Sequence, residues 1–151
     1  MIQTIQIFPQ VLTSNLDNIN FTTTDLRTNS ASCCGWLQYN EGSSNFTIIG
    51  GGTFRISFNA NVTSETAGPL ALALKSSLGD DIEGTEMDTT IAEEGEYQNI
   101  SFTKVIRLCN RVNSTFAIGS LATLGGVTPA VETEIPTIKD ANLIIEKLSG
   151  N

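Results

Sequence analysis

The chain has 151 residues, of which 40% are hydrophobic and only 16% are charged, so it can bury a core as one globular domain and is not a disordered tail. Its formal net charge of −8 repels phosphate, which argues against nucleic acid and anionic membranes as partners. Histidine is absent, which excludes Ser-His-Asp and Cys-His nucleophile systems and histidine-based metal sites.

Residues 1–15 are expected to lie apart from the body of the domain, which spans residues 16–151. The apolar side chains of this N-terminal segment are Ile2, Ile5, Ile7 and Phe8. Two interpretations stay open: a peripheral strand that pairs within the domain, and an arm that docks on another protein. The segment lacks the basic start and the long apolar stretch of a signal peptide. No stretch approaches the ~18 apolar residues of a membrane span.

Three cysteines bear on the redox environment. Cys33 and Cys34 are adjacent and Cys109 is distant, so the count is odd and the spacing does not resemble a secreted disulfide framework. The expected state is buried free thiols that act as small hydrophobes. Synthesis in a reducing cytoplasm fits this pattern.

Two short apolar stretches precede the middle of the chain. A strand is expected around Ile19 and Phe21, followed by a polar loop. Farther along, Trp36 and Tyr39 are interpreted as aromatic side chains of the core or of a subunit interface. An exposed platform for a ligand is the alternative for both.

Residues 53–62 carry the clearest pattern in the chain. Apolar residues occupy the even positions from Phe54 to Val62, and polar residues occupy the odd positions from Thr53 to Asn61. This period of two predicts a strand with one dry and one wet face. In an oligomer, parts of the wet face, which includes Arg55, would meet a neighbouring subunit. The glycines that precede the strand, Gly50 to Gly52, predict a turn.

The later strands follow the same logic. Leucines alternate with alanines over residues 70–75, and further strands are expected over residues 100–109, 115–118 and 141–148. In the last of these, Leu143 and Ile145 point one way and Ile144 and Leu148 the other. A strand that is apolar on both faces is expected to be buried on both. One face would meet the core and the other would meet another subunit.

The acidic stretch over residues 79–96 is interpreted as a solvated loop region. Its first half holds Asp80, Asp81, Glu83, Glu86 and Asp88. A carboxylate pair for glycoside hydrolysis and a calcium site are the alternatives there, but the spacing does not match an EF-hand and clustered loop acids are usually solvated. No catalytic residue, metal ligand or cofactor is expected.

Taken together, the pattern predicts an all-β, antiparallel jelly-roll sandwich of about eight to ten short strands without a helix. Four segments carry a resemblance to a known family. They read G-T-F-R-I-S-F-N-A-N-V (Gly52 to Val62), P-L-A-L-A-L-K (Pro69 to Lys75), I-S-F-T-K-V-I-R-L (Ile100 to Leu108) and A-N-L-I-I-E-K-L (Ala141 to Leu148). The chain resembles the trimeric jelly roll of the tumour necrosis factor and complement globular-head superfamily. It is most similar to the bacterial and phage branch, whose members cap spore-surface collagen-like filaments and tailed-phage fibres.

This resemblance implies a homotrimer, and Trp36, Tyr39, Ile144 and Leu148 are the expected interface residues. No enzymatic activity is expected, because the missing histidine disfavours an esterase or a glycosidase. The leading hypothesis is a structural virion protein: a capsid decoration or head-fibre protein of a tailed phage. It would be made in the host cytoplasm and displayed on the virion surface. Ile2, Ile5, Ile7 and Phe8 would anchor it to the major capsid protein or another virion protein. The alternative is a receptor-binding tip of a phage fibre or spore-surface filament that recognises a host surface glycan.

Overall fold

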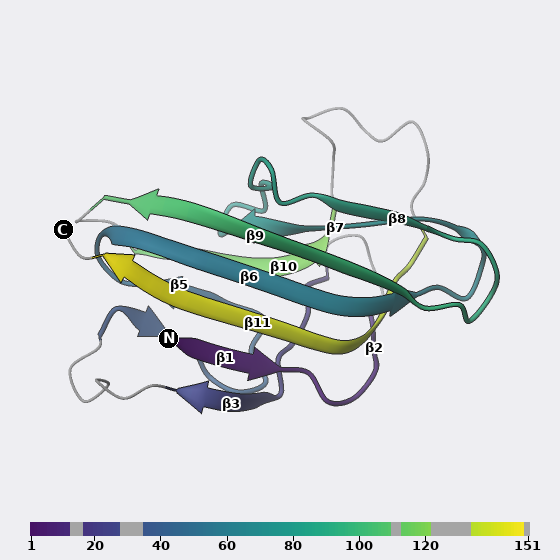
Figure 1. The fold of residues 1–151 in the computed structure, drawn as a ribbon, viewed down its shortest axis with the longest axis horizontal. Coiled ribbons are helices and arrows are strands. Elements are labelled where there is room, and N and C mark those ends of the chain that lie inside the picture. Colours follow the sequence, from purple (N-terminus) through teal and green to yellow (C-terminus); the bar gives the residue numbers. More distant parts are fainter. Residues whose placement is uncertain (13–16, 28–34, 110–112, 122–133, 150–151) are drawn as a thin grey trace.

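A computed structural model describes residues 1–12, 17–27, 35–109, 113–121 and 134–149. In this part of the chain there are eleven strands and no helix, arranged as two antiparallel sheets that face each other (Figure 1). The predicted all-β jelly-roll sandwich is therefore confirmed. Within the described ranges, no helix has the length and apolarity that a membrane crossing requires.

One sheet has six strands. Its order is β3-β1-β11-β6-β9, and β2 also pairs with β11. The bounds are β1 (Ile2–Ile5), β2 (Gln10–Val11), β3 (Thr23–Arg27), β6 (Gly52–Thr63), β9 (Gln98–Leu108) and β11 (Thr137–Ser149). The long strands β6, β9 and β11 lie side by side at the front of Figure 1.

The second sheet has five strands in the order β4-β5-β10-β7-β8. The bounds are β4 (Leu37–Gln38), β5 (Phe46–Ile48), β7 (Gly68–Ser76), β8 (Met87–Ile91) and β10 (Ser114–Ser120). Among the described strands, β4 forms one edge and pairs with β5.

The core lies between the two sheets, where the predicted alternation places it. In β6 the even-numbered residues from Phe54 to Val62 are buried, and in β7 Leu70, Leu72 and Leu74 face them from the other sheet. Phe58 is central, since its ring packs edge-on against Phe21 at 6.4 Å and tilted against Phe102 at 6.0 Å. The expected strand and its dry face are confirmed.

A bulge in β11 keeps both halves of this strand in register with the core. Ile138 pairs with Val62 and Leu143 pairs with Phe58, so a spacing of five residues on β11 matches a spacing of four on β6. One extra residue is absorbed near Asp140, which adopts a positive φ of 54°. Without this extra residue, either Ile138 or Leu143 would point to solvent.

The predicted strand at Ile19 and Phe21 is not a strand. Both side chains are fully buried, but the segment only crosses the second sheet, where Asn18 forms an isolated bridge to Gly119. The Ile19 N–H donates to the Ile118 carbonyl at 2.7 Å. Conversely, the structure places β3 in a stretch expected to be a loop, and β8 within the acidic region.

Candidate functional site

The outer face of the six-stranded sheet carries side chains of the long strands β6, β9 and β11. Strand pairing aligns side chains across it in rows. Glu146 of β11 lies opposite Arg55 of β6, which lies opposite Val105 of β9. The next row on this face places Ile144 opposite Ser57 and Ser57 opposite Thr103. These two rows, together with the exposed Leu148 near the end of β11, form the candidate assembly face.

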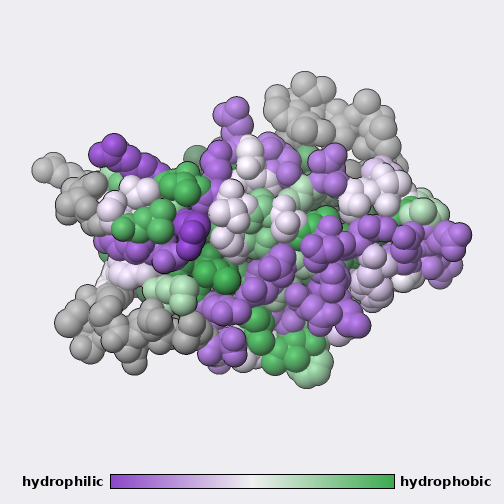
Figure 2. Space-filling view, in the orientation of Figure 1, coloured by the Kyte–Doolittle hydropathy of each residue, from purple (hydrophilic) through white to green (hydrophobic). Residues whose placement is uncertain are grey.

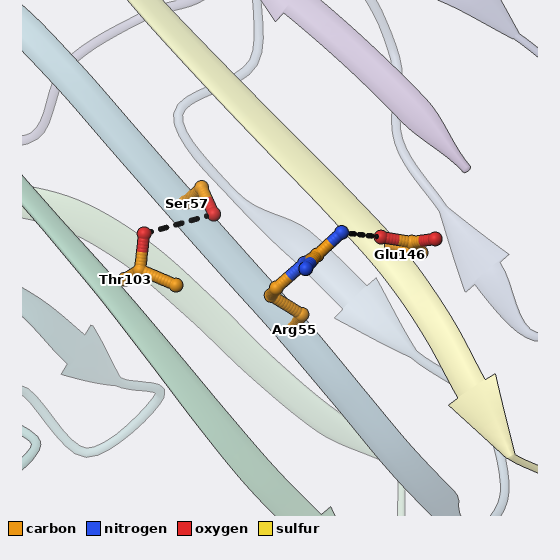
Figure 3. Close-up of polar contacts among 4 residues, drawn as sticks. All are labelled: Arg55, Ser57, Thr103 and Glu146. Atoms are coloured by element: carbon orange, nitrogen blue, oxygen red, sulfur yellow. Dashed lines mark hydrogen bonds and ion pairs between the residues drawn. The ribbon is translucent and has the colours of Figure 1, made fainter.

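Two polar contacts tie the three strands together on this face (Figure 3). The Arg55 guanidinium forms an ion pair with the Glu146 carboxylate, and the Thr103 hydroxyl bonds to the Ser57 hydroxyl at 3.1 Å. Both members of the ion pair are partly exposed. An ion pair exposed to water contributes only about 0–1 kcal/mol to stability. The pair therefore adds little to the stability of the single chain.

Apolar side chains surround this ion pair. Val105 is 53% exposed and Leu148 is 46% exposed, whereas Ile144 is half-buried. Figure 2, which views this face, shows hydrophobic side chains set among hydrophilic ones toward the C-terminal end of β11. Farther along the strands the face becomes polar, and the Asn99 side chain donates to Asn61 at 3.1 Å. One end of the face thus combines apolar surface with a matched pair of charges.

The predicted interface residues fall into two places. Ile144 lies on the outer side of β11, as the sequence indicated, and Leu148 is exposed at a register shift between Lys147 and Ser149. Trp36 and Tyr39 do not join them. Trp36 is half-buried with its ring 5.5 Å from Phe54, and Tyr39 is only 9% exposed within the core cluster. For Trp36 and Tyr39 the structure therefore favours the core interpretation over the ligand platform, since neither ring is openly displayed.

The four residues of the predicted anchor also differ in how far they are buried. Residues 2–5 form β1, which lies in the sheet between β3 and β11, and Ile2 is only 3% exposed. Ile2 is therefore part of the core and cannot contact another particle while β1 keeps its place, which corrects that assignment. Ile5 is half-buried, whereas Ile7 and Phe8 are 51% and 71% exposed. Of the four predicted anchor residues, Ile7 and Phe8 are therefore the two that are mostly exposed.

The cysteine prediction is wrong for Cys109. Its thiol is free, but it is exposed rather than buried. The reason is the alternation along β9, where odd-numbered residues face outward, and Cys109 follows the strand in that phase. Cys33 and Cys34 lie outside the described residues.

Charged side chains do not gather into a metal-binding group in the part of the chain that the structure describes. No group of three or more aspartate, glutamate or cysteine side chains is placed to hold a metal there. Lys75 is the one buried lysine among these residues, and it forms a backbone bridge with Asp81. Burial lowers the pKa of Lys75, and the negative charge of Asp81 partly opposes this shift.

Tyr39 yields a testable pH dependence. Its hydroxyl donates to the Phe21 carbonyl, which also accepts the Gly42 N–H at 2.8 Å. Burial, with a smaller contribution from the charge of Glu41, raises the pKa of Tyr39 to about 12 from 10.0. Between these pH values the unfolded chain loses the proton first. Stability contributed by the neutral phenol is therefore complete below pH 10 and is lost as the pH rises toward 12.

We expect Tyr39→Phe to lower the free energy of unfolding at neutral pH by about 1 kcal/mol, the usual value of one hydrogen bond. The variant should also lose part of the alkaline decline in stability. Denaturant unfolding at neutral and alkaline pH measures both effects. Tyr97→Phe, at the exposed tyrosine, is the matched control and should leave the decline attributable to Tyr39 in place. An unchanged decline in Tyr39→Phe would contradict this assignment.

Comparison with known proteins bears on the class of fold that these two sheets define. No protein-family model matches the sequence, and no curated protein matches it. Solved structures do match. The globular domain of zebrafish complement 1qA covers 99% of this chain and 98% of its own, with a TM-score of 0.62 and 13% identity. Eiger TNF from S. frugiperda covers 99% and 94%, with a TM-score of 0.58 and 7% identity.

Murine APRIL gives a similar result, with 97% of each chain covered, a TM-score of 0.54 and 9% identity. At such identities the likeness shows the fold alone. The chain therefore has a jelly roll of the tumour necrosis factor and complement type, as the resemblance in sequence implied.

Proposed function

We propose that the protein is a non-enzymatic structural protein, a homotrimer that decorates the virion of a tailed phage as a capsid decoration or head-fibre protein. The observation that carries the proposal is the candidate assembly face. Exposed Val105 and Leu148 and half-buried Ile144 surround the ion pair between Arg55 and Glu146. Apolar surface of this kind is stabilised when another protein surface covers it.

Self-assembly is the simplest way to cover this face. Copies related by a three-fold axis would bring the same patch of each chain toward the others, and closed symmetry limits the assembly to a defined size. The jelly-roll fold agrees with the family resemblance, which implies a trimer of the bacterial and phage branch. The net charge of −8 keeps such a particle soluble and disfavours nucleic acid as a partner.

Attachment to the virion is assigned to the exposed pair Ile7 and Phe8. Ile2 is excluded from this role because it belongs to the core of the sheet. Two apolar side chains make a weak contact on their own, but three copies on one trimer would bind with avidity. The partner would be the major capsid protein or another virion protein that offers an apolar pocket.

The mass of the assembly in solution tests the trimer. Light scattering of the purified chain should give three times 16.1 kDa. Leu148→Glu should shift the mass toward the monomer, because a carboxylate would be buried at the contact. Leu78→Glu is the matched control, since Leu78 is exposed but lies in the turn after β7, away from this face. A monomeric wild-type protein would overturn the proposal.

Attachment is tested separately with the double variant Ile7→Ser/Phe8→Ser. This variant should remain a folded trimer, because both side chains are already exposed. Electron microscopy of phage particles assembled with the variant should show capsids without the decoration that the wild-type protein provides. Capsids that stay fully decorated would show that this pair is not the anchor.

A further inference from the structure

A polar groove lies at the β4 edge of the five-stranded sheet, on a different sheet from the assembly face. It has a volume of about 570 Å³. Its lining residues come from β4, β5 and the segment between them: Leu37, Gln38, Tyr39, Asn40, Ser43, Asn45 and Thr47. A smaller groove of about 360 Å³ shares Tyr39 and Asn40 and adds Thr24 and Glu41. The two form one polar surface within a single chain.

Three side-chain amides in this groove are available to a ligand. Gln38, Asn40 and Asn45 are exposed, and their amide groups make no hydrogen bond within the described part of the chain. Each amide presents two N–H donors and one carbonyl acceptor. By contrast, the Ser43 hydroxyl is hydrogen-bonded to the backbone of Asn45. The Thr47 hydroxyl is hydrogen-bonded to the Thr115 hydroxyl at 2.8 Å.

The frame that holds these amides is firmly bonded. The Ser43 N–H donates to the Asn40 carbonyl at 3.0 Å, and the Gly42 N–H donates to the Phe21 carbonyl. The buried hydroxyl of Tyr39 bonds to the same carbonyl, so the chain between β4 and β5 is fixed to the core. Because the backbone is held, a ligand would have to order only the side chains of the three amides.

The chemistry of the groove selects a neutral ligand rich in hydroxyl groups. Among the residues that the structure describes, no lysine or arginine lines either groove, Glu41 lies in the smaller one, and the chain is acidic as a whole. Anionic ligands are therefore repelled. Amides donate to and accept from sugar hydroxyls in pairs, and the aliphatic side chain of Leu37 offers an apolar contact for the C–H face of a sugar ring.

We propose that this groove is a binding site for neutral saccharides, with Gln38, Asn40 and Asn45 as the residues that contact the sugar hydroxyls. The three amides belong to one chain, so the proposal does not depend on the trimer or on attachment to a virion. The site does not rely on an exposed aromatic ring, because Tyr39 is buried and its hydroxyl donates a hydrogen bond to the Phe21 carbonyl.

An array of immobilised oligosaccharides tests the site directly. The probes are neutral glycans that end in glucose, galactose, mannose, rhamnose or N-acetylglucosamine, and sialylated and sulfated glycans as charged counterparts. We expect binding to a subset of the neutral glycans and none to the charged set. The triple variant Gln38→Ala/Asn40→Ala/Asn45→Ala should bind the same neutral glycans at least about tenfold more weakly.

Two controls keep the result interpretable. Asn20→Ala removes another exposed amide outside the groove and should bind like the wild type. The triple variant should keep the wild-type melting temperature, because the three amides support no contact inside the described structure. Full binding by the triple variant, binding of charged glycans only, or a wild-type protein that binds no glycan on the array would each overturn the site. None of these outcomes depends on the mass of the assembly.

Discussion

Phe58→Ala is expected to lower the free energy of unfolding by about 3–5 kcal/mol, the usual cost of removing a large aromatic side chain from a core. Phe58 is fully buried, and its ring contacts Phe21 from a crossing segment and Phe102 from β9. The substitution therefore leaves a cavity where three parts of the chain meet. For a domain of this size the thermal midpoint should fall by roughly 10–15 °C.

Ser57→Ala is the matched control for this prediction. Ser57 directly precedes Phe58 on β6, but its side chain faces outward. Its hydroxyl forms a hydrogen bond with the Thr103 hydroxyl. Its loss should cost less than ~1 kcal/mol. Denaturant unfolding of both variants measures the difference. Equal effects at the two positions would mean that the alternation along β6 does not define the inside of the sandwich.

The strands that the sequence predicted are those in which one local pattern decides the outcome. β6 alternates without interruption over ten residues, and the leucines of β7 alternate in the same way. In such strands the buried face follows from spacing alone. The fold class followed in turn, because several strands of this kind separated by glycine and asparagine turns leave a sandwich as the simplest arrangement.

Other elements depend on pairing across the chain and were missed for that reason. β8 buries only Met87 and Ile91 and is otherwise polar, so its pattern resembles a loop until β7 pairs with it. Ile19 and Phe21 alternate as in a strand, yet their segment only crosses the second sheet. It approaches so closely that a side chain on Gly119 would lie 2.6 Å from the Asp17 carbonyl. Neither the pairing of β8 nor the crossing of this segment can be predicted from local spacing.

The candidate sites likewise combine positions that follow from local spacing with contacts that depend on pairing across the chain. The outward positions of Arg55 and Ile144 follow from alternation, but the partnership of Arg55 with Glu146 depends on the register of β6 against β11. The amides of the groove, Asn40 and Asn45, read as ordinary turn residues in the sequence. Their role as candidate ligand contacts emerges only when the structure shows them exposed beside Gln38, with their amides unbonded in the described residues.

Arg55→Glu is expected to abolish the proposed trimer while leaving the chain folded. In the single chain the ion pair is partly exposed, so its loss should change stability by about 1 kcal/mol or less. In an assembly that covers the candidate face, two carboxylates would instead be buried side by side. Breaking a buried pair costs about 3–5 kcal/mol, so a trimer with three such pairs would lose roughly 10 kcal/mol. Light scattering should then report the mass of a monomer.

The charge-swapped variant Arg55→Glu/Glu146→Arg separates this electrostatic effect from simple damage to the sheet. It restores opposite charges on neighbouring strands, because positions 55 and 146 are paired in register. We therefore expect the double variant to recover most of the trimer that Arg55→Glu loses. If Arg55→Glu remained trimeric, the ion pair would lie outside the contact, and the apolar side chains of Val105 and Leu148 would require a different partner. Recovery by the second substitution would place both charges within one covered surface.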